Sequence, residues 1–436
     1  MTSRTSAPRQ VVVIGGGWAG MAAAVRLAEA GERVVVIEAA RVPGGRARRV
    51  ERDGETLDNG LHILLGAYGE TLSLIRLVTG TEAGLHRLAL RLEIDDRFRL
   101  ACARLPGALS LLAGILTASG LTTLDKLSIV RFMLASRLTG FRARSSMTVA
   151  AVLRESRQPD RARQFLWDPL CLAALNTDPA LANAQTYLHV LRDGLLGGLG
   201  SHDLLLPATD LTRLFPEPAA AYVESRGGAV RLGETVESFH RHAGGFHVRT
   251  RSGSLPATHL VCATDPARAL VLVSQHAELA ESARAIERLS YEPIASIYLK
   301  YAAPPRLRFP MLGSTRGPVQ WFFDRGALCG QRGWIGGVIS ASRPWLGHPA
   351  EALAAHAHEQ LQDLCGELSP PLRFQVITEK RATFACVPHL LRPLPVTPMS
   401  GFYLAGDYTH GDYPATLEAA TRSGTICARA ILEADP

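Results

Sequence analysis

The clearest pattern of apolar and polar positions lies near the N-terminus. The run from Val11 to Ile14 is short and β-branched, which is typical of a strand buried on both faces of a parallel sheet. The segment from Met21 to Gly31 is rich in alanine and ends in glycine, which predicts a helix with a glycine at its C-terminal cap. A second strand is predicted from Arg33 to Ile37, directly before Glu38. The pattern therefore predicts a strand, a helix and a strand in succession.

Three glycines occupy the turn between the first strand and the helix, with the spacing G-x-G-x-x-G. Gly15 allows the tight turn, Gly17 lets backbone approach a pyrophosphate at the helix N-terminus, and Gly20 lets helix and strand pack closely. The carboxylate of Glu38 can bind two ribose hydroxyls and would repel a 2′-phosphate. The unit as a whole predicts a dinucleotide site. Its expected contact residues are Gly15, Gly17, Trp18, Ala19, Gly20 and Glu38.

Two motifs downstream indicate which dinucleotide binds. In the segment from Pro43 to Arg46, a glycine pair and an arginine can close over the pyrophosphate from the other side. This segment resembles the GGR element of the large FAD-binding family that includes amine oxidases and phytoene-type desaturases. The segment from Asp58 to His62 resembles that family's stretch beside the isoalloxazine ring. The resemblance implies FAD contacts from Gly44, Gly45, Arg46, Asn59, Gly60, Leu61 and His62.

A matching motif lies near the C-terminus. Phe402 to Ala405 is a predicted strand that leads into Gly406 and Asp407, and a helix is predicted from Leu417 to Ile431. Amides at a helix N-terminus suit the flavin N1/C2 carbonyl edge, where negative charge develops on reduction. The segment resembles the family's C-terminal flavin motif, which implies contacts from Gly406, Asp407, Thr416 and Leu417. No cysteine lies between residues 387 and 426, so we expect the FAD to be noncovalent.

The fold predicted from these motifs is α/β, with a discontinuous Rossmann-like FAD-binding domain of the amine oxidase and glutathione reductase type. Between its ends, strands are predicted at residues 227–232, 236–240, 246–250 and 259–262. In the family these strands form a meander beside the adenine, which implies that the backbone of Val236 faces that ring. We expect the FAD-binding domain to comprise residues 9–71, 206–287 and 396–436. We expect residues 72–205 and 288–395 to form a substrate domain of mixed sheet and helices.

Several longer stretches extend the resemblance over essentially the whole chain. They include DNGLHILLGAYGETL, FLWDPLCLAALNTDPALANAQT and LAGDYTHGDYPATLEAATRSG. Together they resemble the family of bacterial hydroxysqualene dehydroxylases, also described as squalene-associated FAD-dependent desaturases. The resemblance implies reductive removal of the hydroxyl of hydroxysqualene, a C30 isoprenoid, to give squalene. An oxidative desaturase of the carotenoid or phytoene type is the main alternative, and a prenyl-lipid escort without redox activity is a second one.

Such a reaction needs an acid, because an allylic hydroxyl leaves poorly unless it is protonated. On the flavin side the candidates are His62, Tyr413 and Glu418. In the helical insertion they are Asp168, Asp178, His189, Asp193, His202 and Asp203, of which we take Asp168 as the main one. No spacing selects a single residue. No second G-x-G-x-x-G segment is present for a nicotinamide cofactor, so we expect the flavin to be reduced by a separate electron donor, or slowly by free nicotinamide.

Composition narrows the class of protein. The chain has 436 residues, 47 Lys and Arg, and 40 Asp and Glu, which gives a net charge of +7. That excess is small for a nucleic-acid binder of this length. The seven cysteines are scattered and the histidine pairs lack further ligands at metal spacing, so we assign no metal site. The polar first ten residues predict no secretory signal, and a cytoplasmic protein is expected.

The positive charge is concentrated in one block. Residues 126–163 contain nine basic and two acidic residues and so carry the whole net excess. Just before them, the segment from Leu105 to Leu116 is apolar but too short to span a bilayer. A C30 isoprenoid partitions into membranes, so its enzyme must collect it there. The insertion at about residues 105–163 is therefore predicted to bind an anionic membrane surface, at the inner face of the cell membrane.

Overall fold

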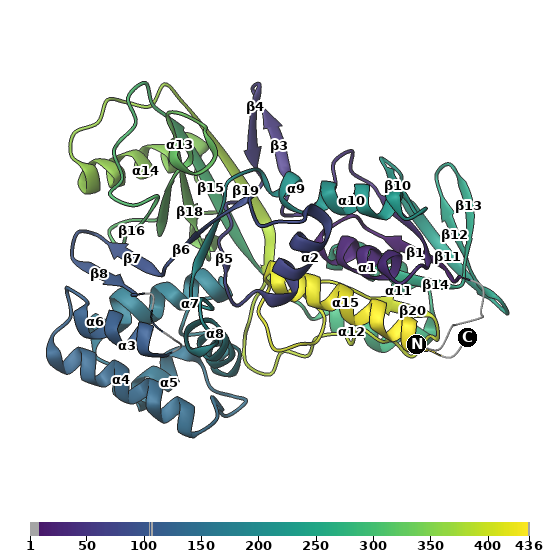
Figure 1. Ribbon diagram of the computed structural model, residues 1–436, viewed down its shortest axis with the longest axis horizontal. Helices are drawn as coiled ribbons and strands as arrows, with labels where there is room; N and C mark the ends of the chain where they lie inside the picture. The colour runs from purple at the N-terminus through teal and green to yellow at the C-terminus, as the bar shows by residue number, and fades with distance from the viewer. Residues whose placement is uncertain (1–7, 104, 106–107, 435–436) are drawn as a thin grey trace.

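A five-stranded parallel sheet organises one of the two lobes of the molecule (Figure 1). The computed structural model describes residues 8–103, 105 and 108–434. The strands pair in register, with Val12 of the central strand between Val35 and Leu260. Their β-branched side chains are buried on both faces, as predicted. In spatial order the strands are β10 (Ala229–Leu232), β2 (Arg33–Glu38), β1 (Gln10–Ile14), β14 (His259–Cys262) and β20 (Phe402–Leu404).

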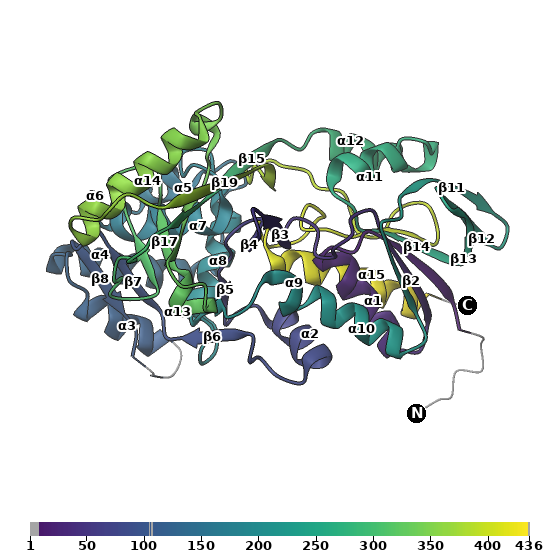
Figure 2. The ribbon, with the colours of Figure 1, turned by 90° about the horizontal axis from the view of Figure 1, so that it is seen from above.

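Two helices from opposite ends of the chain pack against each other beside this sheet. Helix α1 (Trp18–Glu29) and helix α15 (Leu417–Glu433) lie side by side in Figures 1 and 2. A Cβ at Gly424 would lie 2.1 Å from the carbonyl oxygen of Ala19, so glycine is needed for this close approach. The packing brings the N-terminal motif and the C-terminal motif together. The lobe also contains the helices α9 (Leu211–Leu214), α10 (Pro216–Ser225), α11 (Pro266–Val273), η2 (Ala277–Leu279) and α12 (Ala280–Glu287).

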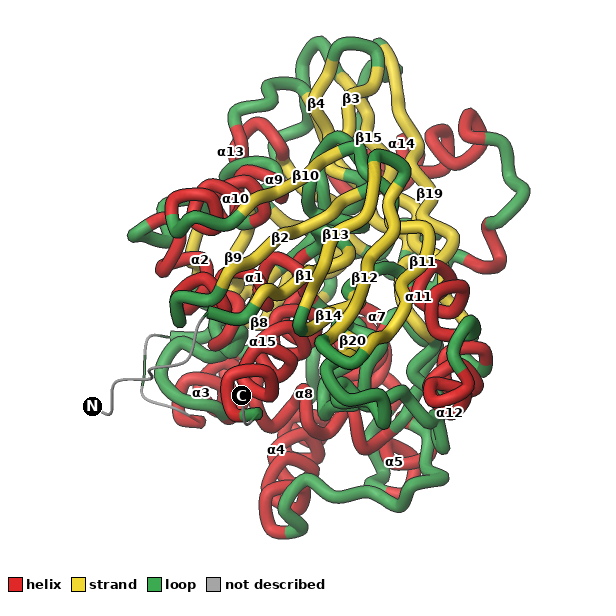
Figure 3. The backbone as a smooth tube through the Cα atoms, turned by 90° about the vertical axis from the view of Figure 1, so that its right-hand side faces the viewer, coloured by secondary structure: helices red, strands yellow, loops and turns green. Residues whose placement is uncertain are grey.

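The antiparallel meander is smaller than the sequence predicts. It consists of β11 (Val236–His242), β12 (Gly245–Thr250) and β13 (Gly253–Ala257), which lie at the outer edge of the lobe in Figures 1 and 2 and face the viewer in Figure 3. The predicted strands at 227–232 and 259–262 belong to the parallel sheet instead, as β10 and β14. Strand β13 was not predicted, because its sequence GSLPA has no clear alternation and contains a proline.

The second lobe is built on a seven-stranded mixed sheet. Its spatial order is β19-β15-β18-β17-β16-β7-β8. Helix α14 (Ala350–Cys365) packs with the sheet over a core that includes Ile297, Ile335 and Leu361. The elements of this lobe are β7 (Arg91–Ile94), β8 (Phe98–Ala101), β15 (Tyr291–Lys300), β16 (Met311–Gly313), β17 (Trp321–Asp324), α13 (Arg325–Cys329), β18 (Trp334–Ile339), η3 (Arg343–Trp345) and β19 (Arg373–Phe384).

The helical insertion gathers at one end of the second lobe (Figures 1 and 2). The predicted apolar segment becomes a helix that begins at Ala108, and Pro106 and Gly107 lie outside the described residues. Within the described parts of the chain, we find no helix that combines the length and the apolar character needed to cross a bilayer. The insertion contains α3 (Ala108–Thr117), α4 (Thr123–Leu138), α5 (Val149–Glu155), α6 (Asp160–Ala162), the π-helical turn η1 (Arg163–Trp167), α7 (Asp168–Leu175) and α8 (Ala184–Leu196).

The domain boundary predicted at residue 72 falls inside helix α2 (Gly69–Thr79). This helix packs against α15, where Thr71 Oγ1 lies 2.8 Å from Thr421 Oγ1, so the first lobe continues to the end of α2. Two smaller units join the lobes. One is the hairpin of β3 (Arg49–Arg52) and β4 (Glu55–Asp58), and the other is the sheet of β5 (Leu64–Leu65), β9 (Leu204–Pro207) and β6 (Leu85–Leu88).

Candidate functional site

A cavity of about 670 Å³ runs from the carboxyl ends of the parallel strands into the second lobe. At the end beside the parallel strands, the cavity wall consists of glycine-rich turns and charged side chains. At the end inside the second lobe, the wall consists of apolar side chains from the mixed sheet and from α7 and α8. We call these two ends the cradle and the chamber. Of the predicted cofactor residues, the cradle wall contains Gly15, Gly17, Trp18, Ala19, Glu38, Gly44, Gly45, Arg46, Asn59, Gly60, Leu61, His62, Val236, Gly406, Asp407, Thr416 and Leu417.

Backbone groups form the floor of the cradle. Gly17 caps α1 without any side-chain cap, so the first amides of that helix are left for a ligand. A Cβ at Gly17 would meet only Gly45 within 4 Å, and it would otherwise extend into open space. Gly20 lies outside the cavity wall, and a Cβ there would lie 1.9 Å from the carbonyl oxygen of Gly15. Gly20 therefore permits helix-to-strand packing, as its place in the motif predicts.

An ion pair joins the N-terminal and C-terminal motifs across the cradle. Arg46 Nη2 lies 2.5 Å from Asp407 Oδ1, and Arg46 Nη1 donates to the carbonyl oxygen of Ala382 at 2.5 Å. Burial opposes the positive charge, but the neighbouring carboxylates outweigh it, so the pKa of Arg46 is raised. A partly exposed guanidinium that stays charged is suited to a pyrophosphate. At the end of β2, Glu38 accepts hydrogen bonds from the backbone of Gly16 and Ala40, at 2.6 and 2.7 Å.

The chamber is lined by apolar side chains from several distant elements. The mixed sheet contributes Leu92, Met311, Trp321, Phe323 and Val338. Helices α7 and α8 contribute Leu170, Leu172, Ala173, Ala174, Val190 and Leu191. We did not predict these residues individually. The continuous run of apolar residues in strands such as WFFD marks them as buried but does not show which cavity they face.

His62 lies in the wall of the cavity and keeps one ring nitrogen for a ligand. Its Nδ1 lies 2.8 Å from the carbonyl oxygen of Gly60 and therefore carries the hydrogen, so Nε2 is left unprotonated in the neutral ring. Burial lowers the pKa of His62, and the Gly60 carbonyl and the Asp58 carboxylate oppose only part of that effect. The ring is thus mostly neutral at neutral pH.

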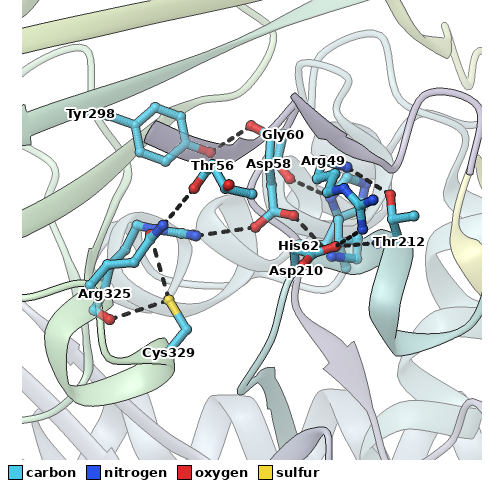
Figure 4. A network of polar contacts seen from close by, with 12 residues as sticks. Arg49, Thr56, Asp58, Gly60, His62, Asp210, Thr212, Tyr298, Arg325 and Cys329 are labelled. Atoms are coloured by element: carbon cyan, nitrogen blue, oxygen red, sulfur yellow. Dashed lines mark hydrogen bonds and ion pairs between the residues drawn. The ribbon is translucent and has the colours of Figure 1, made fainter. Parts of the chain in front are cut away.

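A buried polar network holds the segment that carries His62 (Figure 4). Asp58 accepts hydrogen bonds from the backbone of Leu211 at 2.9 Å and from Arg325 at 3.3 Å. The hydroxyl of Tyr298 donates to the Asp58 carbonyl oxygen at 2.7 Å. Burial raises the pKa of Asp58, although Arg325 opposes this. Residues of both lobes therefore fix the position of this segment.

The other predicted acids have different roles in the structure. Tyr413 lines the cavity, but its hydroxyl donates to Asp193 Oδ2 at 2.7 Å, and burial raises its pKa. Glu418 is fully buried and lies outside the cavity wall, where it accepts from the backbone of Glu70 and Thr71 at the start of α2. These contacts correct the expectation for Glu418, since its carboxylate caps a helix rather than facing the cavity.

Asp168 also lies away from the cavity wall. It begins α7, and its carboxylate is 4.0 Å from Arg163. Burial raises its pKa, but the structure gives it no position from which to protonate a ligand in the cavity. Of the remaining candidates in the insertion, Asp193 and His202 line the cavity. Those that do not are Asp178, His189 and Asp203.

Comparison with known proteins identifies the family. A family model described as flavin containing amine oxidoreductase matches residues 18–432. The chain belongs to this family. The flavin-containing amine oxidoreductases include catalysts of different reactions, so membership establishes an FAD-dependent oxidoreductase and leaves the substrate to other evidence.

The names of individual relatives describe a narrower class of enzyme than the family description does. Hydroxysqualene dehydroxylase of Rhodopseudomonas palustris is 32% identical over 443 residues, covering 98% of this chain and 99% of the relative. The enzyme of the same name from Sinorhizobium fredii is 28% identical, covering 97% and 98%. An oxidoreductase structure from Methanosarcina mazei superposes with a TM-score of 0.73 at 17% identity, covering 97% of this chain and 100% of that one. The predicted resemblance and the predicted fold class are both confirmed.

The cradle of this FAD-dependent oxidoreductase fits a flavin dinucleotide. The uncapped amides of α1 and the open space above Gly17 suit a pyrophosphate. Tyr408 also lines the cavity, and its buried hydroxyl has no hydrogen-bond partner among the described residues. A bound dinucleotide would accept hydrogen bonds from the uncapped amides of α1. Tyr408 was not predicted, because a single tyrosine after the Gly406-Asp407 pair has no distinctive spacing.

Proposed function

We propose that this FAD-dependent oxidoreductase catalyses the reductive dehydroxylation of hydroxysqualene to squalene. The observation that carries the proposal is the continuity of the cavity, which leads from a dinucleotide cradle directly into an apolar chamber. An apolar chamber suits a hydrocarbon chain, since each buried CH₂ contributes about 0.8 kcal/mol. The similarity to the two hydroxysqualene dehydroxylases supports the same substrate.

The cradle residues would hold the FAD without a covalent bond. In the described parts of the chain, the cavity wall contains no cysteine. When bound and reduced, FAD supplies a hydride to carbon. In the substrate, the C–O bond breaks, the hydroxyl takes a proton and leaves as water, and a C–H bond forms at the same allylic position. Each turnover consumes two electrons, so a separate reductant must restore the flavin. Rapid, stoichiometric bleaching of the purified protein by NADPH would show that no separate protein donor is needed.

His62 is the predicted acid whose geometry best suits the proton transfer. It lines the cavity, and its Nε2 is left for a ligand because Nδ1 is bonded to Gly60. In the imidazolium form, Nε2 would donate its proton to the leaving hydroxyl. The apolar chamber would keep water from the allylic cation that remains, so that the cation meets hydride rather than solvent.

The proposed partner for substrate uptake is an anionic membrane surface. Four leucines of α4 project from the insertion, among them Leu124 and Leu138, whose side chains are 78% and 89% exposed. Helix α3 adds a row of three more exposed leucines. Lys126, Arg131 and Arg137 lie on α4 among these apolar residues. Leucines beside cationic side chains are typical of a helix that lies in a membrane interface. The leucines in these two rows are Leu109, Leu112, Leu116, Leu124, Leu127, Leu134 and Leu138.

Vesicle binding tests the membrane proposal. The wild-type protein should sediment with anionic vesicles at low salt and less at high salt, and the variant Leu124→Ser/Leu138→Ser should lose most of that binding. A matched control is Leu372→Ser/Leu391→Ser, which changes two leucines of similar exposure outside the insertion. Equal retention on neutral and anionic vesicles at low salt would contradict the proposal.

Anaerobic turnover tests the reaction itself. Photoreduced holoenzyme mixed with hydroxysqualene should form squalene and reoxidise one flavin for each product molecule. Formation of a more unsaturated product with oxidised flavin would instead show an oxidative desaturase. Protein that is colourless and cannot be reconstituted with FAD would indicate a lipid carrier.

A further inference from the structure

One row of side chains in the chamber wall crosses the mixed sheet from strand to strand. Phe323 of β17 pairs with Met311 of β16. Two residues further along β16, Gly313 pairs in parallel with Ile94 of β7. The same register places Met311 beside Leu92 of β7. Because Phe323, Met311 and Leu92 all lie in the cavity wall, the row follows the chamber at right angles to the strands.

The row begins beside the segment that carries His62. On β18, Gly336 pairs with Phe323. A Cβ at Gly336 would lie 2.6 Å from Cδ1 of Leu61, so the side chain of Leu61 covers the sheet at this position. Leu61 directly precedes His62, which is the acid in the proposed reaction. This end of the row is therefore next to the place where the hydroxyl of the substrate would leave.

The row leaves the cavity at its other end, between β7 and β8. Leu92 pairs with Leu100 of β8, which is fully buried and is not part of the cavity wall. Leu100 belongs to the same hydrophobic core as Leu111 and Ile115 of helix α3. The packed core of the insertion thus closes the chamber behind Leu92, and a ligand that follows the row ends at this side chain.

The spacing of the strands sets the length of the row. From Gly336 to Leu92 the row passes from β18 to β17, β16 and β7, and at about 4.8 Å between neighbouring strands it spans about 14 Å. An extended carbon chain advances by about 1.2 Å per bond, as an extended polypeptide does, so about twelve bonds fit. An isoprenoid has four main-chain carbons in each five-carbon unit. The row therefore matches about three units, a C15 chain, which is half of a C30 isoprenoid.

We propose that this part of the chamber holds one C15 arm of the isoprenoid alcohol, and that Leu92 limits the length of that arm. This inference rests on the proposed function and specifies which isoprenoid alcohols fit the site. Up to this length, each added carbon is buried against the row and strengthens binding. A longer arm would have to displace the packed core behind Leu92, and protein interiors have little empty space to accept it.

Binding of allylic alcohols of increasing length to the oxidised holoenzyme tests the assignment, because oxidised flavin cannot reduce them. The probes are geraniol (C10), farnesol (C15) and geranylgeraniol (C20), and their dissociation constants are measured by the change in flavin absorbance. In the wild-type protein, affinity should rise by at least about 10-fold from C10 to C15, since the added unit is buried against the row. Affinity should not rise further from C15 to C20.

Substitutions at Leu92 should change this limit in opposite directions. Leu92→Phe adds bulk at the end of the chamber, so it should weaken farnesol by about 10-fold and leave geraniol within about twofold of its wild-type value. Leu92→Ala removes bulk there, so it should strengthen geranylgeraniol relative to farnesol. Each comparison is made between two proteins for the same alcohols, so differences in solubility between the alcohols cancel.

Leu312→Phe is the matched control. Leu312 follows Met311 on β16 and is similarly buried, at 7% exposed against 4% for Leu92, but it packs in the core on the opposite face of the sheet, outside the cavity wall. This variant should keep all three wild-type dissociation constants. If Leu92→Phe weakens the three alcohols equally, or weakens none of them, the assignment is wrong. Loss of flavin absorbance in Leu92→Phe would show misfolding, and a wild-type ratio of geranylgeraniol to farnesol in Leu92→Ala would then refute the assignment.

The turnover experiment separates this inference from the proposed function. If photoreduced wild-type protein converts hydroxysqualene but the Leu92 variants keep the wild-type dependence on length, the function stands and the role of Leu92 is refuted. If the alcohols show the expected limit but hydroxysqualene is not reduced, the arm site stands and the proposed reaction is refuted. If neither the limit nor the conversion is observed, both are refuted.

Discussion

The two ends of the cavity are built on different principles. The cradle consists mainly of backbone from short, continuous motifs, in which glycines allow the chain to approach a ligand. The chamber consists of side chains that come from the mixed sheet and from α7 and α8, far apart in the sequence. A backbone site depends on conformations that few residues permit, whereas an apolar wall tolerates many side chains of similar volume. Single substitutions in the cradle should therefore either abolish ligand binding or leave it unchanged. Single substitutions in the chamber should weaken it by intermediate amounts.

The largest effect is expected at Gly20, which packs helix α1 against the turn that forms the cradle. A Cβ there would lie 1.9 Å from the carbonyl oxygen of Gly15, and a backbone atom cannot move aside without distorting the turn. Gly20→Ala should therefore abolish FAD binding, measured as flavin absorbance per protein after purification and reconstitution. Gly69→Ala is the control, because nothing lies within 4 Å of a Cβ at that position. A yellow, stable Gly20→Ala protein would show that the turn is not tightly packed.

The second-largest effect is expected at His62, in the cavity wall between the cradle and the chamber. If His62 donates the proton, His62→Gln should lower kcat by about 10²–10⁴-fold while flavin content stays unchanged. Burial lowers the pKa of His62, so its acidic form is populated only below the ordinary range for histidine. In the wild-type protein kcat should therefore rise as the pH falls towards that pKa, and in His62→Gln this dependence should disappear. An unchanged pH profile in the variant would assign the proton to another group.

The same contrast explains how far the sequence predicts the structure. The cradle was predictable because Gly15, Gly17 and Arg46 belong to motifs whose spacing reflects one geometry. The role of Glu418 was not, because a carboxylate that caps α2 and one that faces a ligand look alike in sequence. The pairing of His202 with Ser110 depends on packing between segments that are 92 positions apart. No local sequence pattern predicts such a contact. The extent of α2 was likewise decided by its contacts with α15.

A third effect tests how firmly both lobes hold the segment between cradle and chamber. Asp58→Ala removes the ion-pair partner of the buried Arg325 guanidinium and the acceptor of the Leu211 amide. Removing one partner of a buried ion pair costs about 3–5 kcal/mol of stability. Denaturant unfolding should show this loss for Asp58→Ala. The double variant Asp58→Ala/Arg325→Met, which removes both charges, should recover part of it. Equal stability of the single variant and the wild type would show that the network contributes little to the stability of the fold.

The smallest effect is expected at Glu418, which supports the cradle from behind. Glu418→Gln keeps one acceptor for the α2 amides but loses the charge that faces the N-terminus of that helix and Arg422. Charge at a helix N-terminus contributes up to about 2 kcal/mol when it is partly buried, so unfolding should become easier by about 1–2 kcal/mol. Because the carboxylate lies outside the cavity wall, kcat per bound flavin should stay within about twofold of the wild-type value. A fall in kcat of more than 10-fold without any loss of stability would instead place Glu418 in the chemistry, and would show that the cavity extends behind the start of α15 during turnover.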